Sequence, residues 1–466
     1  MSRWVDRNAI EKLAQNFRGV LFQAEDAGYE DARKVWNGMM DDRRPCLIAR
    51  CSGTADVVAA VRFAREHGIL PAIRGGGHSA AGKGTCDGGM VIDLSAMRSV
   101  FVNPQQRTAI AQGGALWGDY DRETQMFGLA SPGGVVSTTG IGGFTLGGGI
   151  GWLTRRFGLA CDNLIGVDLV TADGNHRLVT NESDPELMWA LRGGGGNFGV
   201  ATSLHYKLHA VGPIVFGGPL VFSLEHAEEV FALVDDAFQT APDELGIGVV
   251  VSPIKPVALF PVEMHWRPIV AVVLCWTGDL TQGEKVVAPF RQIGRPLLDG
   301  VGPISYETLQ KGFDDLAPAG RRSYWKSGYL RELSPRVAQD FVKYGAEPQS
   351  PYSQVEAQVL GGAFGRIGHD DTAFGDRTGR AIFNVEGLWL MPEDDEANVA
   401  WAHNGFADLE RYSTGTAYVN FLSEEGDDRV RAAYGAKYYR LARVKAKYDP
   451  DNFFRINQNI VPSASA

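Results

Sequence analysis

Three clusters of glycine constrain the fold of this chain more than any other feature of its sequence. They lie at residues 75–77, 131–151 and 192–200, and glycine becomes sparse beyond about residue 212. Because glycine has no Cβ, such a backbone can adopt positive φ and bring its N–H groups close to an anion. The first cluster follows the apolar segment 69–73 and suits a pyrophosphate. The clusters therefore indicate a large ligand in the N-terminal half.

The second cluster is not typical of a linker or of a membrane helix. Residues 131–151 interleave glycine with Ile, Leu, Phe and Trp, whereas flexible linkers are rich in Gly and Ser without such side chains. Arg155 and Arg156 follow directly, which disfavours a membrane helix packed through small residues. We expect a packed backbone that lies flat against a planar ligand.

Charge and composition exclude several classes of protein. A formal net charge of −10 and a pI near 5.5 argue against a nucleic acid or an anionic membrane as partner. The N-terminus is too charged for a secretory signal, and no apolar run reaches the length of a membrane span. Five scattered cysteines show no spacing typical of a disulfide framework or a zinc site. We expect a cytoplasmic protein without a metal.

The N-terminal half shows the rhythm of an α/β domain. A helix over 55–67, for which Thr54 is the expected N-cap, separates short strands at 44–50 and 69–73. The glycine hinge opens at the carboxyl end of the second strand, where ligands bind in open α/β sheets. Further expected elements are strands at 89–94 and 108–113, helices at 115–127 and 185–191, and a hairpin at 166–180 that turns at Asp173-Gly174.

Two domains are expected from the length of 466 residues. Beyond about residue 212, aromatic-rich strands alternate with amphipathic helices such as 227–240. Near the C-terminus a basic helix ends at Asp449-Pro450 and is followed by the tail 453–461. That tail carries too many apolar residues to hang free.

Taken in order, the motifs of this chain resemble the berberine bridge enzyme-like branch of the vanillyl-alcohol oxidase and p-cresol methylhydroxylase superfamily. The resemblance covers nearly the whole chain. The chain lacks the pattern of a Rossmann domain. In that fold a glycine-rich fingerprint follows the first strand, and an acidic residue stands about twenty residues further on. The matching segments are 74–79, 139–143 with 147–151, 157–163, 192–200 and 448–459.

The resemblance implies an α+β protein with a large antiparallel sheet covered by helices in its second domain. We expect a two-subdomain FAD-binding domain of the vanillyl-alcohol oxidase type over 1–212, with its core from about 42 to 212. A substrate-binding domain would follow over 213–421. Residues 422–466 would return to the FAD-binding domain.

The resemblance also implies FAD, joined through its 8α-methyl group to His78. Many relatives add a bond from a cysteine, and Val136 stands where that cysteine would be, so we expect a single covalent bond. Asn457 and Asn459 are expected to return to the flavin, with burial of the tail as the alternative. Asp162 and Asn163 could contact the ligand, but we interpret them as turn residues, because Asx side chains commonly form turns. The further residues expected to hold the cofactor are Arg74, Gly75, Gly76, Gly77, Ser79, Pro132, Gly133, Ser137, Thr138, Gly140, Gly142, Gly143, Gly199 and Val200.

The catalytic base of the family lies on a strand that follows a turn, which here corresponds to residues 372–377. In the following strand, 380–390, Glu386 and Asn384 alternate with apolar residues and would face one side of the sheet. A carboxylate in an apolar strand is costly unless it is used or paired, so a catalytic role competes with a salt bridge.

Other candidates for the substrate side are aromatic and polar residues in two further segments. Tyr418 and Asn420 would share a strand face, and Tyr418 could act as a base if a cation lowered its pKa. Tyr324 and Lys326 are candidates in 323–327, and Trp117 is expected to wall the cavity. Packing is the alternative for each aromatic residue.

These residues favour an FAD-linked oxidase that moves a hydride from an alcohol, a sugar or an amine to the flavin and passes the electrons to O₂, giving H₂O₂. The alternatives are a dehydrogenase or oxygenase with the same flavin, and a non-catalytic flavin-binding protein. A polar, aromatic second domain beside a complete cofactor site argues for turnover. We expect a small-molecule substrate and a monomer or homodimer.

Overall fold

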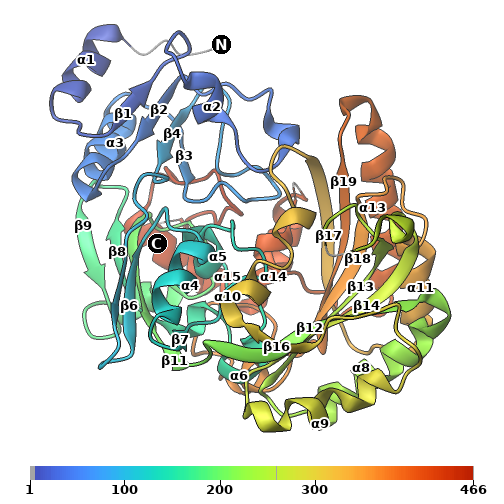
Figure 1. Cartoon of the computed structure of the whole chain (residues 1–466). Helices are drawn as coiled ribbons and strands as arrows, with labels where there is room; N and C mark the ends of the chain where they lie inside the picture. The colour runs from blue at the N-terminus through green and yellow to red at the C-terminus, as the bar shows by residue number, and fades with distance from the viewer. Residues whose placement is uncertain (1–5, 259, 424, 465–466) are drawn as a thin grey trace.

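The computed structural model describes residues 6–258, 260–423 and 425–464. Within these ranges the strands form sheets of four, five, two and eight strands. Figure 1 shows the smaller sheets on one side of the molecule and the eight-stranded sheet on the other. The predicted α+β architecture with a large second sheet is confirmed.

The four-stranded sheet delivers the glycine hinge. Its order is β1-β2-β4-β3, and β2, β3 and β4 run parallel. The helix α3 (Thr54–Glu66) connects β2 to β3, which ends directly before the first glycine cluster. The strands are β1 (Val20–Phe22), β2 (Leu47–Arg50), β3 (Pro71–Arg74) and β4 (Met90–Asp93).

The predicted N-cap of α3 is wrong. Thr54 is the first residue of the helix, Gly53 holds the cap position, and no side chain caps there. The carboxylate of Asp56 in the first turn instead fixes the segment before the helix, because it accepts hydrogen bonds from the backbone N–H and the hydroxyl of Ser52, both at 2.8 Å. An acidic residue in the first turn also suits the positive end of the helix dipole.

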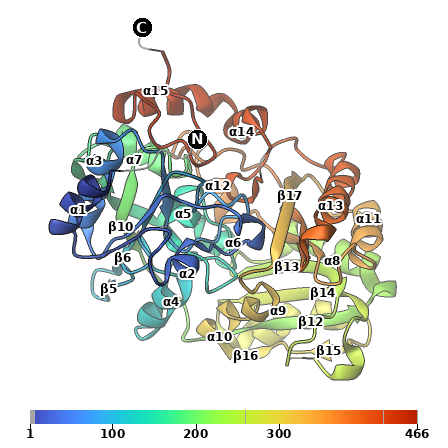
Figure 2. The ribbon, with the colours of Figure 1, turned by 90° about the horizontal axis from the view of Figure 1, so that it is seen from above.

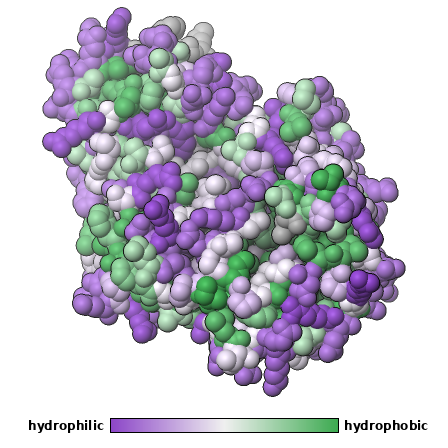
Figure 3. Space-filling view, in the orientation of Figure 1, coloured by the Kyte–Doolittle hydropathy of each residue, from purple (hydrophilic) through white to green (hydrophobic). Residues whose placement is uncertain are grey.

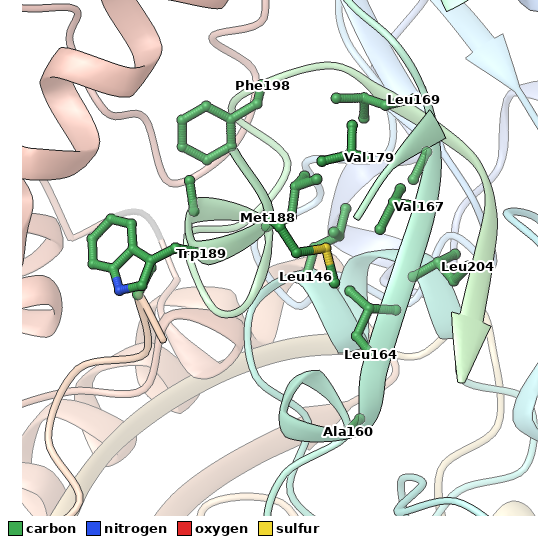
Figure 4. Packing of buried hydrophobic residues seen from close by; sticks show 14 of the residues in the cluster. Leu146, Ala160, Leu164, Val167, Leu169, Val179, Met188, Trp189, Phe198 and Leu204 are labelled. Atoms are coloured by element: carbon green, nitrogen blue, oxygen red, sulfur yellow. The ribbon is translucent and has the colours of Figure 1, made fainter. Parts of the chain in front are cut away.

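The five-stranded sheet is antiparallel, in the order β5-β6-β10-β8-β9. The predicted turn at Asp173-Gly174 is confirmed: it joins β8 to β9, and Gly174 has a φ of +73°. The helix α7 (Pro185–Leu191) packs on this sheet through Met188, which lies against Leu164 and Val167 (Figure 4). The strands are β5 (Val100–Asn103), β6 (Thr108–Gln112), β8 (Leu164–Val170), β9 (His176–Val179) and β10 (Val200–Lys207), with the separate pair β7 (Leu129–Ala130) and β11 (His209–Ala210).

The eight-stranded sheet is antiparallel, and helices cover its outer face (Figure 1). The helices are α8 (Ala227–Thr240), α9 (Leu280–Arg291), α11 (Pro335–Gly345) and α13 (Asp395–Glu410). The path is β15-β12-β14-β13-β18-β19-β17, with β16 paired to β12. The strands are β12 (Ile214–Ser223), β13 (Leu245–Pro253), β14 (Pro268–Trp276), β15 (Leu298–Asp299), β16 (Gly302–Ser305), β17 (Arg322–Leu330), β18 (Gln354–Val359) and β19 (Ala381–Trp389).

The C-terminal segment lies along the first half of the molecule. Figure 2 shows α15 (Tyr438–Tyr448) beside α7, with α14 (Asp427–Tyr434) next to α15. The tail is packed, since Phe453 and Phe454 join the core around β2 and β4. The domain boundaries stay a prediction; in the structure, the large sheet begins at Ile214, and Val419 already packs in the core of the first half.

The remaining helices are short or lie at the periphery. They are α1 (Arg7–Gln15), α2 (Tyr29–Arg33), α4 (Trp117–Gln125), α5 (Ile141–Leu146), α6 (Thr154–Phe157), α10 (Tyr306–Gln310) and α12 (Ala363–Arg366). In the described ranges, none of the helices combines the length and the apolar character needed to cross a membrane.

Candidate active site

A cavity of about 350 Å³ joins the two halves of the molecule. All three glycine clusters line one side of it, and strands β18 and β19 of the large sheet line the other. Phe454, Asn457 and Gln458 bring the C-terminal tail to the same cavity. The surface is indented between the lobe that carries α1–α3 and the lobe that carries β17–β19 (Figure 3).

The first glycine cluster needs its glycines because two backbones cross there. An ideal Cβ on Gly76 would lie 2.5 Å from the Cα of Gly140, and one on Gly140 would lie 2.3 Å from the backbone nitrogen of Gly76. Gly77 has a φ of +70°. The first and second clusters therefore pack backbone to backbone and form one continuous surface.

The side chain of Arg74 is an anchor for the hinge. Its guanidinium donates to both carboxylate oxygens of Asp93, at 3.0 and 2.5 Å, and to the carbonyls of Ala32 and Lys34 at 2.5 and 3.0 Å. In these four hydrogen bonds the guanidinium donates to other groups of the protein. Arg74 lines the cavity while its charge is held by Asp93.

His78 lies in the cavity against an aromatic side chain that the sequence did not single out. Its ring stacks on Trp36, with centroids 4.6 Å apart and an interplanar angle of 22°. The hydroxyl oxygen of Thr138 lies 3.4 Å from Nε2. Burial lowers the pKa of His78 to about 4, so the ring is neutral near pH 7 and keeps a free nitrogen lone pair.

The other predicted cofactor residues divide into two groups. Ser137 turns away, because its N–H and hydroxyl donate to Asp314 at 2.8 and 2.5 Å, and Val200 lies in the core. Thr138 reaches the site through His78. The predicted residues that line the cavity are Arg74, Gly75, Gly76, Gly77, His78, Ser79, Val136, Gly140, Gly142, Gly143, Gly199 and Asn457. Those outside this lining are Pro132, Gly133, Ser137, Thr138, Val200 and Asn459.

Two expectations for the second glycine cluster need correction. Residues Ile141–Leu146 form the short helix α5 rather than a flat backbone. Trp117 does not wall the cavity: it is fully buried in the core, and an ideal Cβ on Gly133 would lie 2.7 Å from its ring. Gly133 is thus required for packing against the indole.

The opposite wall of the cavity is polar. Asn384 and Glu386 share a face of β19, as the alternation predicts, and both line the cavity. Their partners across the strands are Glu356 and Gln354 of β18, which the sequence analysis missed. The alternation Gln-Val-Glu-Ala-Gln-Val at 354–359 is the signal that could have found them.

Glu386 is held by an amide rather than by a salt bridge. Its carboxylate accepts a hydrogen bond of 2.7 Å from Nε2 of Gln354, and the residue is 5% exposed. Burial raises the pKa of Glu386, and the nearby carboxylate of Glu356 raises it further, while the ammonium group of Lys255 opposes them. A buried carboxyl with a raised pKa can exchange a proton near neutral pH.

The structure does not bring Tyr324 and Lys326 into the cavity. On β17, Trp325 lines it, so the neighbouring residues point to the helix-covered face. The Tyr324 hydroxyl lies 3.1 Å from Nε2 of His403, and Nζ of Lys326 lies 2.5 Å from Glu425. Tyr324 therefore packs against a helix residue, and Lys326 forms an ion pair.

Tyr418 and Asn420 are close to each other, but the predicted strand is wrong. Residues Val419–Phe421 form a 3-10 helix. The Tyr418 hydroxyl accepts hydrogen bonds from the N–H of Gly149 and from Nδ2 of Asn420, both at 2.8 Å, and burial raises its pKa. Asn420 lines the cavity, whereas Tyr418 is a fully buried, protonated support behind it.

Asp162 and Asn163 are structural, as interpreted from the sequence. Asp162 forms a buried ion pair with Arg377 at 2.6 Å. Nδ2 of Asn163 donates to the carbonyls of Phe157 and Leu159 at 2.9 and 2.8 Å. These bonds fix the segment that follows the second glycine cluster.

The cavity fits a large polar cofactor such as FAD. Within the described part of the chain, buried polar atoms of several lining residues have no hydrogen-bond partner, among them Nε1 of Trp152, Nε1 of Trp325, the hydroxyl of Tyr434 and Oδ1 of Asn457. Such atoms normally have a partner, so they point to a ligand with polar groups. A Cβ on Gly143 or Gly196 would meet open space. Among the described residues, no group of three His, Cys, Asp or Glu side chains could hold a metal ion.

Comparisons with known proteins identify FAD-binding relatives of this chain. The family described as FAD binding domain matches residues 45–180, and the family described as Berberine and berberine like matches residues 417–461. An FAD-linked oxidoreductase of Dictyostelium discoideum is 30% identical over 97% of each chain. The (R)-6-hydroxynicotine oxidase of Paenarthrobacter nicotinovorans is also 30% identical, over 97% of this chain and 98% of its own.

Solved structures show the same fold. The 6-hydroxy-D-nicotine oxidase of Arthrobacter nicotinovorans superposes with a TM-score of 0.82 and 29% identity, over 96% of this chain and 98% of its own. Phl p 4, a grass pollen allergen with glucose dehydrogenase activity, gives a TM-score of 0.85 at 22% identity, over 98% and 100% of the two chains. At that identity the likeness concerns the fold alone. The resemblance expected from the motifs is confirmed: the chain belongs to the berberine bridge enzyme-like family of FAD-linked oxidoreductases.

Proposed function

We propose that this oxidoreductase is an oxidase that carries FAD on a single covalent bond to His78 and oxidises an alcohol, a sugar or an amine. Its electrons would pass to O₂ and give H₂O₂. The observation that carries the proposal is one cavity in which His78 and the glycine clusters face the buried carboxyl of Glu386 and the partly buried carboxyl of Glu356.

In this proposal one wall of the cavity holds the cofactor, and the opposite wall accepts the proton of the substrate. FAD, when bound, supplies the acceptor for a hydride. The neutral ring of His78 is available for covalent attachment, and Val136 offers no second nucleophile. Across the cavity, Glu386 and Glu356 are placed to take the proton that leaves the substrate oxygen or nitrogen. Trp325 walls the space beside them and helps to exclude water.

Attachment is tested by precipitating the protein in acid and measuring the flavin absorbance of the pellet and the supernatant. Wild-type protein is expected to keep its flavin in the pellet, and His78→Ala is expected to release it. His209→Ala is a matched control, because His209 also has a pKa lowered to about 4 by burial but stacks on Phe157 outside this cavity. Flavin that leaves wild-type protein in acid would refute the covalent bond.

Substrate and acceptor are tested by anaerobic flavin bleaching. The panel contains (R)-6-hydroxynicotine, glucose, a benzylic alcohol and a cyclic amine, because relatives or fold neighbours are named for the first two. Admission of air to the reduced protein should restore the yellow colour within seconds and produce one H₂O₂ per flavin. Slow reoxidation without peroxide would favour a dehydrogenase, the activity named for the neighbour Phl p 4.

A further inference from the structure

Lys255 is a buried lysine that reaches the cavity wall through another side chain. It is 4% exposed and lies just beyond the end of β13. Its Nζ donates a hydrogen bond to Oε1 of Gln354, which lines the cavity. Nothing in the proposed reaction uses this ammonium group directly, although burying it is costly.

The contacts of Gln354 fix the direction of its amide. Its Nε2 donates to Glu386 at 2.7 Å and to Glu356 at 3.2 Å. An ammonium group can only donate, and an ionised carboxylate can only accept. Because Lys255 holds the carbonyl oxygen, the NH₂ group must face the two carboxyls.

Two acidic groups and one basic group meet in this network. Two carboxyls, Glu356 and Glu386, face Lys255, and their charges oppose the lowering of its pKa by burial. Arg321 has the smallest influence on Lys255 and stacks on Tyr352 at 4.0 Å. Burial raises the pKa of both carboxyls, and Lys255 lowers both. Buried charges are tolerated when they are paired, and one ammonium group pairs with one carboxylate.

We propose that Lys255 is a positioning residue: it locks the Gln354 amide with its NH₂ group toward Glu386 and Glu356, and its charge makes the two carboxyls share one proton instead of holding two. This inference rests on the proposed function, in which that pair takes a proton from the substrate. With one proton shared, one carboxyl is ionised and can accept the substrate proton. With two protons, neither carboxyl can act as a base.

The test is an infrared titration of the flavin-loaded protein, which follows the C=O band of protonated carboxyl groups against pH. Difference spectra with Glu386→Gln and Glu356→Gln assign the bands of the pair. In wild-type protein we expect one protonated carboxyl from this pair at neutral pH. Two protonated carboxyls, or none, would overturn the proposal without any change at Lys255.

Variants of Lys255 test its part in the network. Lys255→Met should leave both carboxyls protonated at neutral pH and raise the titration midpoint by about one unit or more, since an opposite charge nearby lowers a carboxyl pKa by 1–3 units. Lys255→Arg, which keeps the charge, should restore most of the shift. Lys326→Met is the matched control, because Lys326 is also buried but lies on the other face of the sheet.

A Lys255→Met protein that folds, keeps its flavin spectrum and titrates like wild type would refute the role of the lysine. If that variant does not fold, Glu356→Gln replaces it, because removal of the second carboxyl should lower the midpoint of Glu386; an unchanged midpoint would refute the shared proton. The infrared readout needs no substrate. Failure of this inference is therefore distinct from failure of the proposed oxidation, which flavin bleaching tests.

Discussion

Asp121 of α4 is a buried acid at the junction of the two halves, and its replacement should change how stability depends on pH. The side chain is fully buried. Its Oδ2 accepts a hydrogen bond of 3.0 Å from Nε2 of Gln310 on α10, and the same nitrogen donates to the carbonyl of Gly134 in the cavity wall. Burial raises the pKa of Asp121 from 3.8 to about 7.

The size and sign of the effect follow from this shift. A carboxyl whose pKa is higher in the folded state stabilises the protein at low pH, and this stabilisation is lost as the pH rises through the folded pKa. A shift of about three units corresponds to roughly 4 kcal/mol in the free energy of unfolding. Between pH 5 and pH 8.5 the change should be about 3 kcal/mol, because part of the loss already occurs below pH 5.

The assay is urea unfolding of wild-type protein and Asp121→Asn, both loaded with flavin, at pH 5 and pH 8.5. Asparagine keeps an oxygen for Gln310 and does not ionise. The stability of the variant relative to wild type should therefore rise by about 3 kcal/mol between the two pH values. This difference cancels other titrating groups, including His78 and His209. A relative stability that is the same at both pH values would refute the reasoning.

Three further outcomes follow from the site. Glu386→Gln should slow anaerobic flavin reduction by about 10²–10⁴-fold, because it removes an acid–base group; an unchanged rate would assign the proton transfer elsewhere. Gly76→Ala should lower the ratio of visible to ultraviolet absorbance, because its Cβ clashes with Gly140 and displaces the cofactor surface. Lys326→Met should lower the free energy of unfolding by about 3 kcal/mol by leaving Glu425 less well paired, and should not change the reduction rate.

The sequence was most informative where a short-range pattern has a single structural meaning. Alternation in β19 placed Asn384 and Glu386 on one face, and the structure puts both at the cavity. The same rule, applied to β17, would have separated Trp325 from Tyr324 and Lys326, but alternation alone does not say which face of a strand is the cavity face. That assignment depends on the packing of α13, which contacts β17 and β19 and is separated from β17 along the chain by β18 and β19.

The missing parts of the site depend on contacts between distant segments. Trp36 reaches His78 from the N-terminal region, and Lys255 reaches Gln354 from the segment after β13, so neither lies within a motif. Tyr418 was predicted in a strand, and its β-branched and aromatic neighbours favour one. In the structure its hydroxyl instead accepts a hydrogen bond from the backbone N–H of Gly149. The local preference for a strand is therefore outweighed at this position by a buried hydrogen bond.

The tail that lines the cavity also sets the earliest time at which the cofactor site can exist. Phe454, Asn457 and Gln458 line the same cavity as the hinge at residues 74–79. During synthesis the N-terminal sheet can fold long before these residues leave the ribosome. The complete cavity therefore forms only after residue 458 has emerged, so the covalent attachment proposed for His78 would follow the synthesis of residues 1–458.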